Sequence, residues 1–163
     1  MDDSRGRPTN DAPFRLIQDV RFGSGVRVFS FVNLYGCSID DDSVIGPFVE
    51  IQNDVTVGKR CKIQSHSFLC SGIVVEDEVF IGHGVVFVND KHPRATTEAG
   101  ELQRAEDWEL LPVTVERGAS IGSGALVLGG IRIGAGALVG AGAVVTRNVP
   151  AGAVVAGVPA RSR

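Results

Sequence analysis

A repeat of six residues runs through most of this 163-residue chain and limits the folds that it can adopt. Positions counted in sixes from Ile39 to Phe87, and again from Val115 to Val145, are all apolar. Until the pattern breaks, a small or β-branched residue follows four positions after each of them. This period fits neither the 3.6 residues of a helical turn nor the alternation of a simple hairpin sheet. It predicts short strands joined by tight corners, with the aliphatic residues inside.

The corners of this pattern carry residues that tolerate a positive φ or form local hydrogen bonds. They include Asp41–Asp42, Asn53–Asp54, Gly122–Gly124 and Gly134–Gly136. Before Ile39 the same count continues one residue out of step and places four more residues inside: Leu16, Phe22, Val28 and Leu34. We therefore expect one all-β domain over residues 14–163, preceded by a flexible tail at 1–13.

Composition and charge exclude several classes of protein. The chain is 44% hydrophobic with a formal net charge of −3, which suits one compact domain. It has no run of the kind expected for a signal peptide or a membrane span. Its three cysteines follow no metal-binding spacing, so reduced thiols and a cytoplasmic location are expected. A pI of about 5.6 without a basic stripe argues against nucleic-acid binding.

Charge is distributed unevenly along the chain. From Gly118 to Arg163 there is no acidic residue, and the charged side chains are four arginines. A glycine-rich, weakly basic segment of this kind could receive an anionic ligand. The alternative is that small residues simply displaced acidic ones, and charge alone does not decide between the two.

The repeat breaks between Phe87 and Val113, which predicts a long loop at 88–112. Its first part, VNDKHPRA, places Asn89, Asp90, Lys91 and Arg94 close together. A long excursion without repeats inside a compact domain is usually functional or disordered. We interpret this loop as part of a ligand site.

The copies IGSGAL, IGAGAL and VGAGAV, with the ending VVAGVPAR, resemble the hexapeptide-repeat acyltransferases over roughly residues 16–161. The resemblance implies a left-handed parallel β-helix with three hexads to a coil. It also implies acetyl-CoA as co-substrate and a homotrimer with active sites at subunit interfaces, which the loop reaches.

Within that group, GHGVVFVNDKHPRA is most similar to the sugar-nucleotide N-acetyltransferases, which acetylate the 3-amino group of UDP- or dTDP-linked sugars. An amine acceptor needs orientation more than a strong base, and the side-chain oxygen of Asn89 could hold its N–H. Asp90 could accept a proton or bind a sugar hydroxyl. A hydroxyl acceptor would instead need a histidine base.

His66 and His83 are the candidate bases. Their separation is one position short of three hexads, so we expect them on adjacent coils with backbones about 5 Å apart. The alternative is that they are structural corner residues, and His66 could also contact substrate. The chain lacks the H-x-x-x-x-H spacing of the zinc-binding β-helix enzymes, so no metal is expected.

Charge predicts the diphosphate contacts, the one-residue slip in register predicts the sugar contacts, and the resemblance predicts the acetyl-CoA contacts. For the sugar nucleotide we expect Lys91 and Arg94 at the diphosphate, with Asn33 and Tyr35 as sugar contacts. Acetyl-CoA is expected along the later coils, at Gly122, Ala125, Gly140, Gly142 and Ala143 for its arm and Arg147 or Arg161 for its phosphates. The small residues could instead only keep the coil narrow.

The leading interpretation is an N-acetyltransferase acting on a nucleotide-linked 3-amino sugar for surface polysaccharide synthesis. Two alternatives stay open. The first is an O-acetyltransferase of a sugar or small alcohol, which would depend on a histidine. The second is a non-catalytic β-helix that serves in assembly and would not bind CoA.

Overall fold

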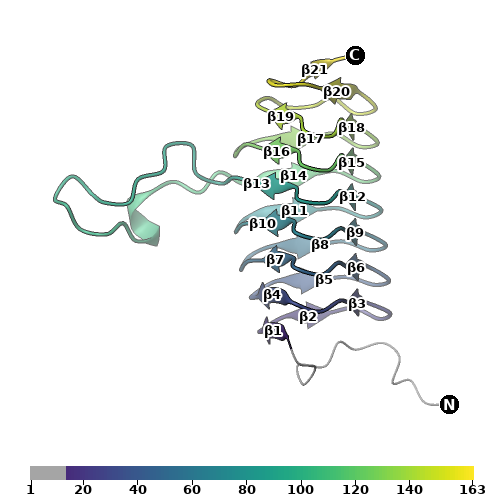
Figure 1. Cartoon of the computed structure of the whole chain (residues 1–163), viewed down its shortest axis with the longest axis horizontal. Coiled ribbons are helices and arrows are strands. Elements are labelled where there is room, and N and C mark those ends of the chain that lie inside the picture. Colours follow the sequence, from purple (N-terminus) through teal and green to yellow (C-terminus); the bar gives the residue numbers. More distant parts are fainter. Residues whose placement is uncertain (1–13) are drawn as a thin grey trace.

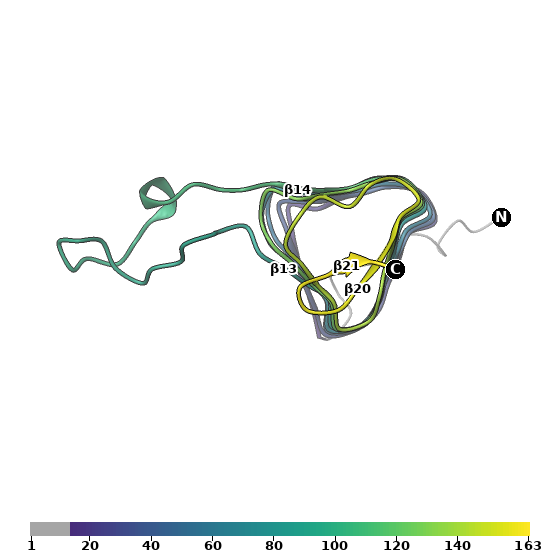
Figure 2. The same cartoon turned by 90° about the horizontal axis from the view of Figure 1, so that it is seen from above.

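The computed structural model describes residues 14–163; the tail predicted at 1–13 lies outside them. The described chain winds into a stack of three-sided coils, with one long loop projecting from it (Figure 1). In Figure 2, β14 (Val113–Val115) follows the loop, and the chain runs clockwise as it advances towards the viewer. The coil is therefore left-handed, as predicted. Residues 14–163 contain no helix with the length and apolar character to cross a membrane.

Each coil contributes one strand to each of three sheets, and the coils pair almost entirely in parallel. Sheet A contains β1 (Arg15–Gln18), β4 (Val32–Tyr35), β7 (Glu50–Ile51), β10 (Phe68–Leu69), β13 (Val86–Phe87), β16 (Leu126–Val127) and β19 (Val144–Val145). Sheet B contains β2 (Arg21–Phe22), β5 (Ser38–Ile39), β8 (Thr56–Val57), β11 (Ile73–Val75), β14 and β17 (Arg132–Ile133).

Sheet C contains β3 (Arg27–Val28), β6 (Val44–Ile45), β9 (Lys62–Ile63), β12 (Phe80–Ile81), β15 (Ser120–Ile121), β18 (Leu138–Val139), β20 (Val154–Ala156) and β21 (Arg161–Ser162). Only β21 is antiparallel to its neighbour among these strands. We call the three bends of the coil corner AB, corner BC and corner CA, after the two sheets that each one joins in chain order.

The hexad positions form the interior of the coil. Ile45 pairs with Ile63, and Ile63 pairs with Ile81, so one regular coil contains three hexads, as predicted. These three side chains are fully buried, at 0–1% exposure. Burying an aliphatic side chain of this size stabilises a fold by about 1.5–3 kcal/mol. The repeat therefore places one such contribution on each side of each coil.

The first coils are shorter than the rest by a single position. Ile17 pairs with Leu34, and Leu34 with Ile51, in each case one position short of three hexads. The missing position is at corner AB, where Gly36 turns with a φ of 59°. The prediction that Leu16 faces inward is wrong, because Ile17 takes that position and Leu16 is 70% exposed.

The long loop leaves the coil after β13 and returns at β14. Ile81 still pairs with Ile121 on the far side of it, so the loop is an insertion into one coil that leaves the register unchanged. Figure 2 shows it extending away from corner AB. It carries one short 3-10 helix, η1 (Ala105–Asp107), and no described strand of the three sheets.

Corner BC is held by a ladder of ion pairs. Asp41 pairs with Lys59 at 3.0 Å, and Asp77 pairs with Arg117 at 2.8 Å. The Lys59 backbone N–H also donates to Asp77 at 2.9 Å, which lowers the pKa of that carboxyl. The bond from Lys59 likewise lowers the pKa of Asp41. The cations of this corner are thus engaged within the coil and are not free for a ligand's phosphates.

Acidification should weaken this ladder. Because the folded pKa values of Asp41 and Asp77 lie below their unfolded values, their contribution is present above about pH 4 and is lost as pH falls through the folded pKa. We expect a melting temperature that is nearly constant from about pH 7 to 5 and falls below about pH 4. Asp77→Asn should be less stable at neutral pH and less sensitive to acid, whereas Glu98→Gln, on the exposed loop, should match the parent. Equal acid sensitivity in all three proteins would contradict the role of the ladder.

Candidate active site

Corner CA carries one column of residues in the left-handed conformation. Each has a φ between 59° and 72°, and each after the first donates its backbone N–H to the coil below. In ascending order the column contains Phe14, Phe31, Phe48, His66, Gly84, Gly124 and Gly142. It therefore changes character in the middle of the coil, from aromatic rings to bare glycines.

The lower half of this column is an aromatic ladder formed by Phe14, Phe31, Phe48 and His66. Neighbouring ring centroids are 5.0, 4.9 and 4.7 Å apart, and the ring planes differ by 27°, 3° and 18°. A residue with a side chain in the left-handed region destabilises the fold by roughly 1–2 kcal/mol, and a stacked pair of rings stabilises it by roughly 0.5–1.5 kcal/mol. Phe31 and Phe48 are both 49% exposed.

The upper half of the column leaves the corner open. A Cβ atom placed on Gly84, Gly124 or Gly142 would meet no other atom within 4 Å. Backbone at these positions is accordingly accessible along one edge of the coil, from the level of His83 upward. A ligand with amide groups could lie close to the main chain here.

His83 lies beside this edge, at the centre of its corner. Its Nδ1 is 2.8 Å from the Ser65 hydroxyl on the coil below, and its backbone N–H donates to the Ser123 hydroxyl on the coil above at 3.1 Å. The ring is exposed, so Nε2 can reach a ligand. Ser65 was not predicted as a site residue, although a count of three hexads back from His83 would have found it.

His66 and His83 lie on adjacent coils, as predicted, but they do not occupy matching positions. Gly84 follows His66 in its column, because His83 falls one position short of a full coil. His66 stacks on Phe48 instead. The two histidines therefore have different surroundings: one belongs to a hydroxyl pair and the other to an aromatic ladder.

Asn89 anchors the start of the long loop at corner AB. Its side-chain Nδ2 donates to the Ser71 carbonyl at 3.0 Å, and its backbone carbonyl accepts the Leu111 N–H at 2.8 Å. The amide group is half-buried, and its oxygen has no hydrogen bond among residues 14–163. The oxygen predicted to orient an amine is thus the end of the side chain that the coil leaves available.

Asp90 and Lys91 line a cavity of about 470 Å³ within the loop, together with His92 and Trp108. Asp90 accepts the His92 backbone N–H at 2.8 Å, which fixes the local turn. Arg94 is exposed and does not line this cavity. Trp108 was not singled out as a site residue, because a single tryptophan in an acidic loop has no spacing that reveals it.

The loop residues and the histidine corner lie at opposite ends of sheet A. Asn89 follows His83 by six positions, with β13 between them, and six extended residues span at most about 20 Å at about 3.3 Å per residue. The chain therefore brings His66, His83 and Ser65 together, and separately Asn89, Asp90 and Lys91. Within one copy of the chain the two groups do not converge.

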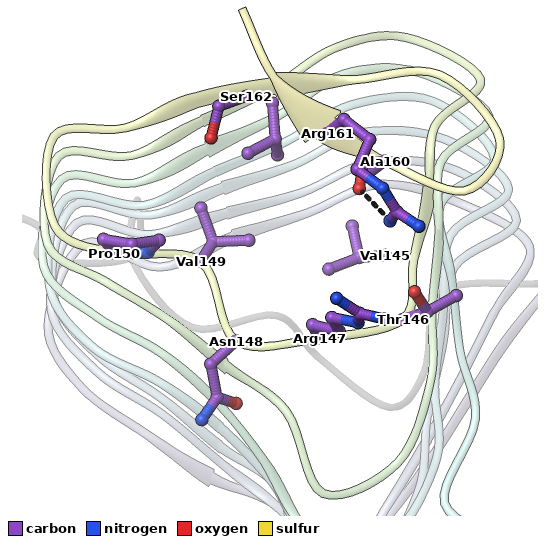
Figure 3. Close-up of a pocket in the computed structure, with 10 residues that line it drawn as sticks. Val145, Thr146, Arg147, Asn148, Val149, Pro150, Ala160, Arg161 and Ser162 are labelled. Atoms are coloured by element: carbon purple, nitrogen blue, oxygen red, sulfur yellow. Dashed lines mark hydrogen bonds between the residues drawn. The ribbon is translucent and has the colours of Figure 1, made fainter.

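Arg147 and Arg161, predicted to bind phosphates, meet in one pocket at the C-terminal end of the coil (Figure 3). The pocket has a volume of about 150 Å³ and also includes Thr146 and Asn148. Arg161 comes from the antiparallel strand β21, and both arginines are exposed. The end of the coil thus presents two cations on one concave surface.

The small residues predicted to contact the arm of acetyl-CoA comprise two alanines and three glycines, which differ in their surroundings. The methyl groups of Ala125 and Ala143 point into the coil, at 0–1% exposure, and their backbone groups are already hydrogen-bonded within it. We therefore expect them to keep the corner narrow. A Cβ atom on Gly122 or Gly140 would clash at 2.5 or 2.9 Å with the next coil, whereas Gly142 faces open space.

Asn33 and Tyr35 lie on the outer face of β4. They line a shallow pocket of about 400 Å³ at the N-terminal end of sheet A, with Leu16 and Gln18. Partial burial and the nearby Glu50 carboxylate raise the pKa of the Tyr35 phenol, so it stays a neutral donor. Two coils, those of β7 and β10, lie between this pocket and β13.

The described residues contain no group of three metal-ligating side chains placed to hold an ion. The cysteines Cys37, Cys61 and Cys70 are free and buried in the coil. Burial raises the pKa of Cys37 and Cys70 to about 11, so neither is a thiolate nucleophile at neutral pH.

A family model described as bacterial transferase hexapeptide (six repeats) matches residues 36–71 and 112–147. These are coils on either side of the long loop. The chain thus carries the repeat of this family on both sides of the loop. The matched residues include Ser65, His66 and the glycines Gly122 to Gly142, but not the loop that carries Asn89.

Several relatives are similar to this chain in sequence. A serine acetyltransferase from Buchnera aphidicola subsp. Acyrthosiphon pisum is 36% identical over 113 residues, covering 68% of this chain and 41% of the relative. The chain spans less than half the length of the first curated relatives that it matches.

Two solved structures extend the comparison. AntD, an N-acyltransferase from Bacillus cereus, was solved as a mutant with dTDP and coenzyme A; it has a TM-score of 0.75 at 19% identity and covers 88% of this chain and 82% of its own. A mutant GDP-perosamine N-acetyl transferase from Caulobacter crescentus, with CoA and GDP-perosamine, has a TM-score of 0.59 at 22% identity and covers 91% and 57%. At these identities the comparison establishes the fold.

Asn89→Ala should loosen the start of the loop. Removing the donor to the Ser71 carbonyl should cost about 1 kcal/mol of stability and speed protease cleavage within 91–110. The measurement is limited proteolysis with mass spectrometry, beside a thermal melt. His92→Ala, which removes a loop side chain without a hydrogen bond in the described chain, is the control. Equal cleavage of the parent and Asn89→Ala would show that this bond does not hold the loop.

Proposed function

We propose that this chain is an acetyl-CoA-dependent N-acetyltransferase that acetylates the 3-amino group of a UDP- or dTDP-linked amino sugar. Its product would enter surface polysaccharide synthesis in the cytoplasm. The proposal rests on the family, on the two polar clusters at the ends of sheet A, and on the open edge beside His83.

The hydrogen-bond partner of His83 is the observation that favours an amine acceptor over a hydroxyl acceptor. A histidine that deprotonates a hydroxyl is usually held by a carboxylate, which fixes the tautomer and stabilises the imidazolium. Here Nδ1 faces the neutral Ser65 hydroxyl, and no carboxylate bonds to the ring among residues 14–163. Serine can orient the ring but gives the imidazolium little stabilisation. This suits an amine, whose lone pair is already nucleophilic.

The reaction would then need modest help from the protein. The neutral amine attacks the thioester carbonyl, a C–N bond forms, and the C–S bond breaks as the thiolate leaves. The extra proton on nitrogen passes to His83 Nε2, to Asp90 or to the leaving thiolate. The Asn89 oxygen accepts an amine N–H and directs the lone pair at the carbonyl.

The open edge at Gly124 and Gly142, on the coils above His83, is the position we propose for the pantetheine arm of acetyl-CoA. It runs upward from His83 towards the end of the coil. The pocket at Arg147 and Arg161 would receive the phosphates at that end. Lys91 and Arg94, on the loop, would face the diphosphate of the sugar nucleotide.

Because His83 and Asn89 lie at different corners of the coil, on either side of β13, we infer that the active site forms between two copies of the chain. The loop of one copy would supply Asn89 to the histidine corner of the next. A homotrimer closes such head-to-tail contacts into a ring.

The test is thiol release from acetyl-CoA with paired acceptors: UDP- and dTDP-linked 3-amino sugars and their 3-hydroxy counterparts. We expect release with the amines only. Ser65→Ala should retain most of the activity, because serine orients His83 without acting as a base. Asn89→Ala should lose about 100-fold in kcat, since a misplaced nucleophile costs about that much.

Release only with the hydroxy sugars would make the chain an O-acetyltransferase. A large loss in His83→Ala with Asn89→Ala unaffected would point the same way. Failure to release thiol with any acceptor, together with no CoA binding by calorimetry, would favour a non-catalytic assembly module.

A further inference from the structure

The last ring of the aromatic ladder at corner CA is the imidazole of His66, and this residue is exposed. Phe48 covers one face of that ring at a centroid distance of 4.7 Å. The next position of the column is Gly84, where a side chain would meet nothing within 4 Å. The second face of the His66 ring is therefore left uncovered by its own column.

This arrangement gives His66 a role that differs from the base first considered. Its ring makes no side-chain hydrogen bond in the described chain, so nothing there sets its tautomer. It is held instead by ring stacking on Phe48, which in turn stacks on Phe31. A ring fixed in this way is suited to offer its flat face.

We propose that the pyranose ring of the acceptor stacks on the free face of His66, in the space that Gly84 leaves open. The inference rests on the proposed function and names the part of the acceptor that this corner recognises. The C–H face of a sugar is apolar and fits an aromatic plane, as the next ring of the ladder would. The spacing of the ladder places that ring at the level of the coil that carries His83.

The position favours the sugar over the nucleobase of the same molecule. His83 lies next to Gly84 in the chain, so a ring stacked there has its substituents beside the histidine. A stacked base would instead hold the reacting amine a whole diphosphate and sugar away. Only the sugar brings the amine to the group that can take its proton.

The substitution Gly84→Phe should fill this space without a change in backbone conformation. Phe31 and Phe48 already adopt a φ of 62° and 59° in this column, so Gly84→Phe, at a φ of 63°, should be accommodated. Gly118→Phe is the matched control. It has a φ of 69°, donates its N–H to the coil below in the same way, and faces equally open space at corner BC.

The experiment measures the acceptor KM and kcat with the UDP- and dTDP-linked 3-amino sugars, and the Kd of CoA by calorimetry. We expect Gly84→Phe to raise the acceptor KM at least about tenfold, while CoA affinity and the Gly118→Phe protein stay within about twofold of the parent. An unchanged KM, or an equal loss of CoA affinity, would overturn the inference, the latter by giving the space to the arm of CoA.

His66 variants test the same idea without the glycine. His66→Phe keeps a flat ring and should retain the parent KM, whereas His66→Ala should raise it. Loss of kcat in both variants would instead make His66 a base and contradict stacking.

The outcome can be separated from failure of the proposed function. If the parent transfers no acetyl group to any acceptor, saturation-transfer NMR with methyl 3-amino-3-deoxyglucoside still reports on the sugar. Signal from one face of its ring in the parent and in Gly118→Phe, lost in Gly84→Phe, would support the stacking site. Equal signal in all three proteins, or none in the parent, would overturn it.

Discussion

The rest of this structure depends on the parallel hydrogen bonding between successive coils. Because each coil pairs with the next in fixed register, a residue meets the same position one coil away, three hexads along in the regular part. Buried aliphatic side chains keep the three sheets at a constant distance. Side chains at the corners consequently line up in columns, and a column acts as a unit: a stack of rings, a ladder of charges or an open edge.

The three corners use these columns differently. Corner BC engages its charges with one another, as in the pair of Asp77 and Arg117, and so serves the stability of the coil. Corner AB releases the long loop, held at its start by Asn89 and Ser71. Corner CA changes from aromatic rings to bare glycines next to His83. Our proposal thus assigns stability and ligand contact to separate edges of one scaffold.

The coil could be predicted from the sequence because interior positions need only be aliphatic, and Ile63 and Ile81 meet that need at a fixed period. The contacts at the corners could not be predicted, because a shift of one residue along the chain changes which side chains meet there. The shorter first coils exchanged Leu16 for Ile17 in the interior, and His66, one position short of a full coil from His83, left Ser65 as the residue opposite that histidine. The sequence suggested one site from Asn89 and the histidines, whereas the length of sheet A separates them.

The most direct test of the account is hydrogen exchange with and without CoA, followed by mass spectrometry. The account predicts slower exchange in peptides that contain residues 122–124 and 140–142, and at the Arg147 pocket. Peptides from corner BC, at 58–60 and 76–78, should be unchanged in the same sample. Protection at corner BC instead, or none at corner CA with CoA bound, would contradict the claim that the open glycine edge beside His83 receives the acyl donor.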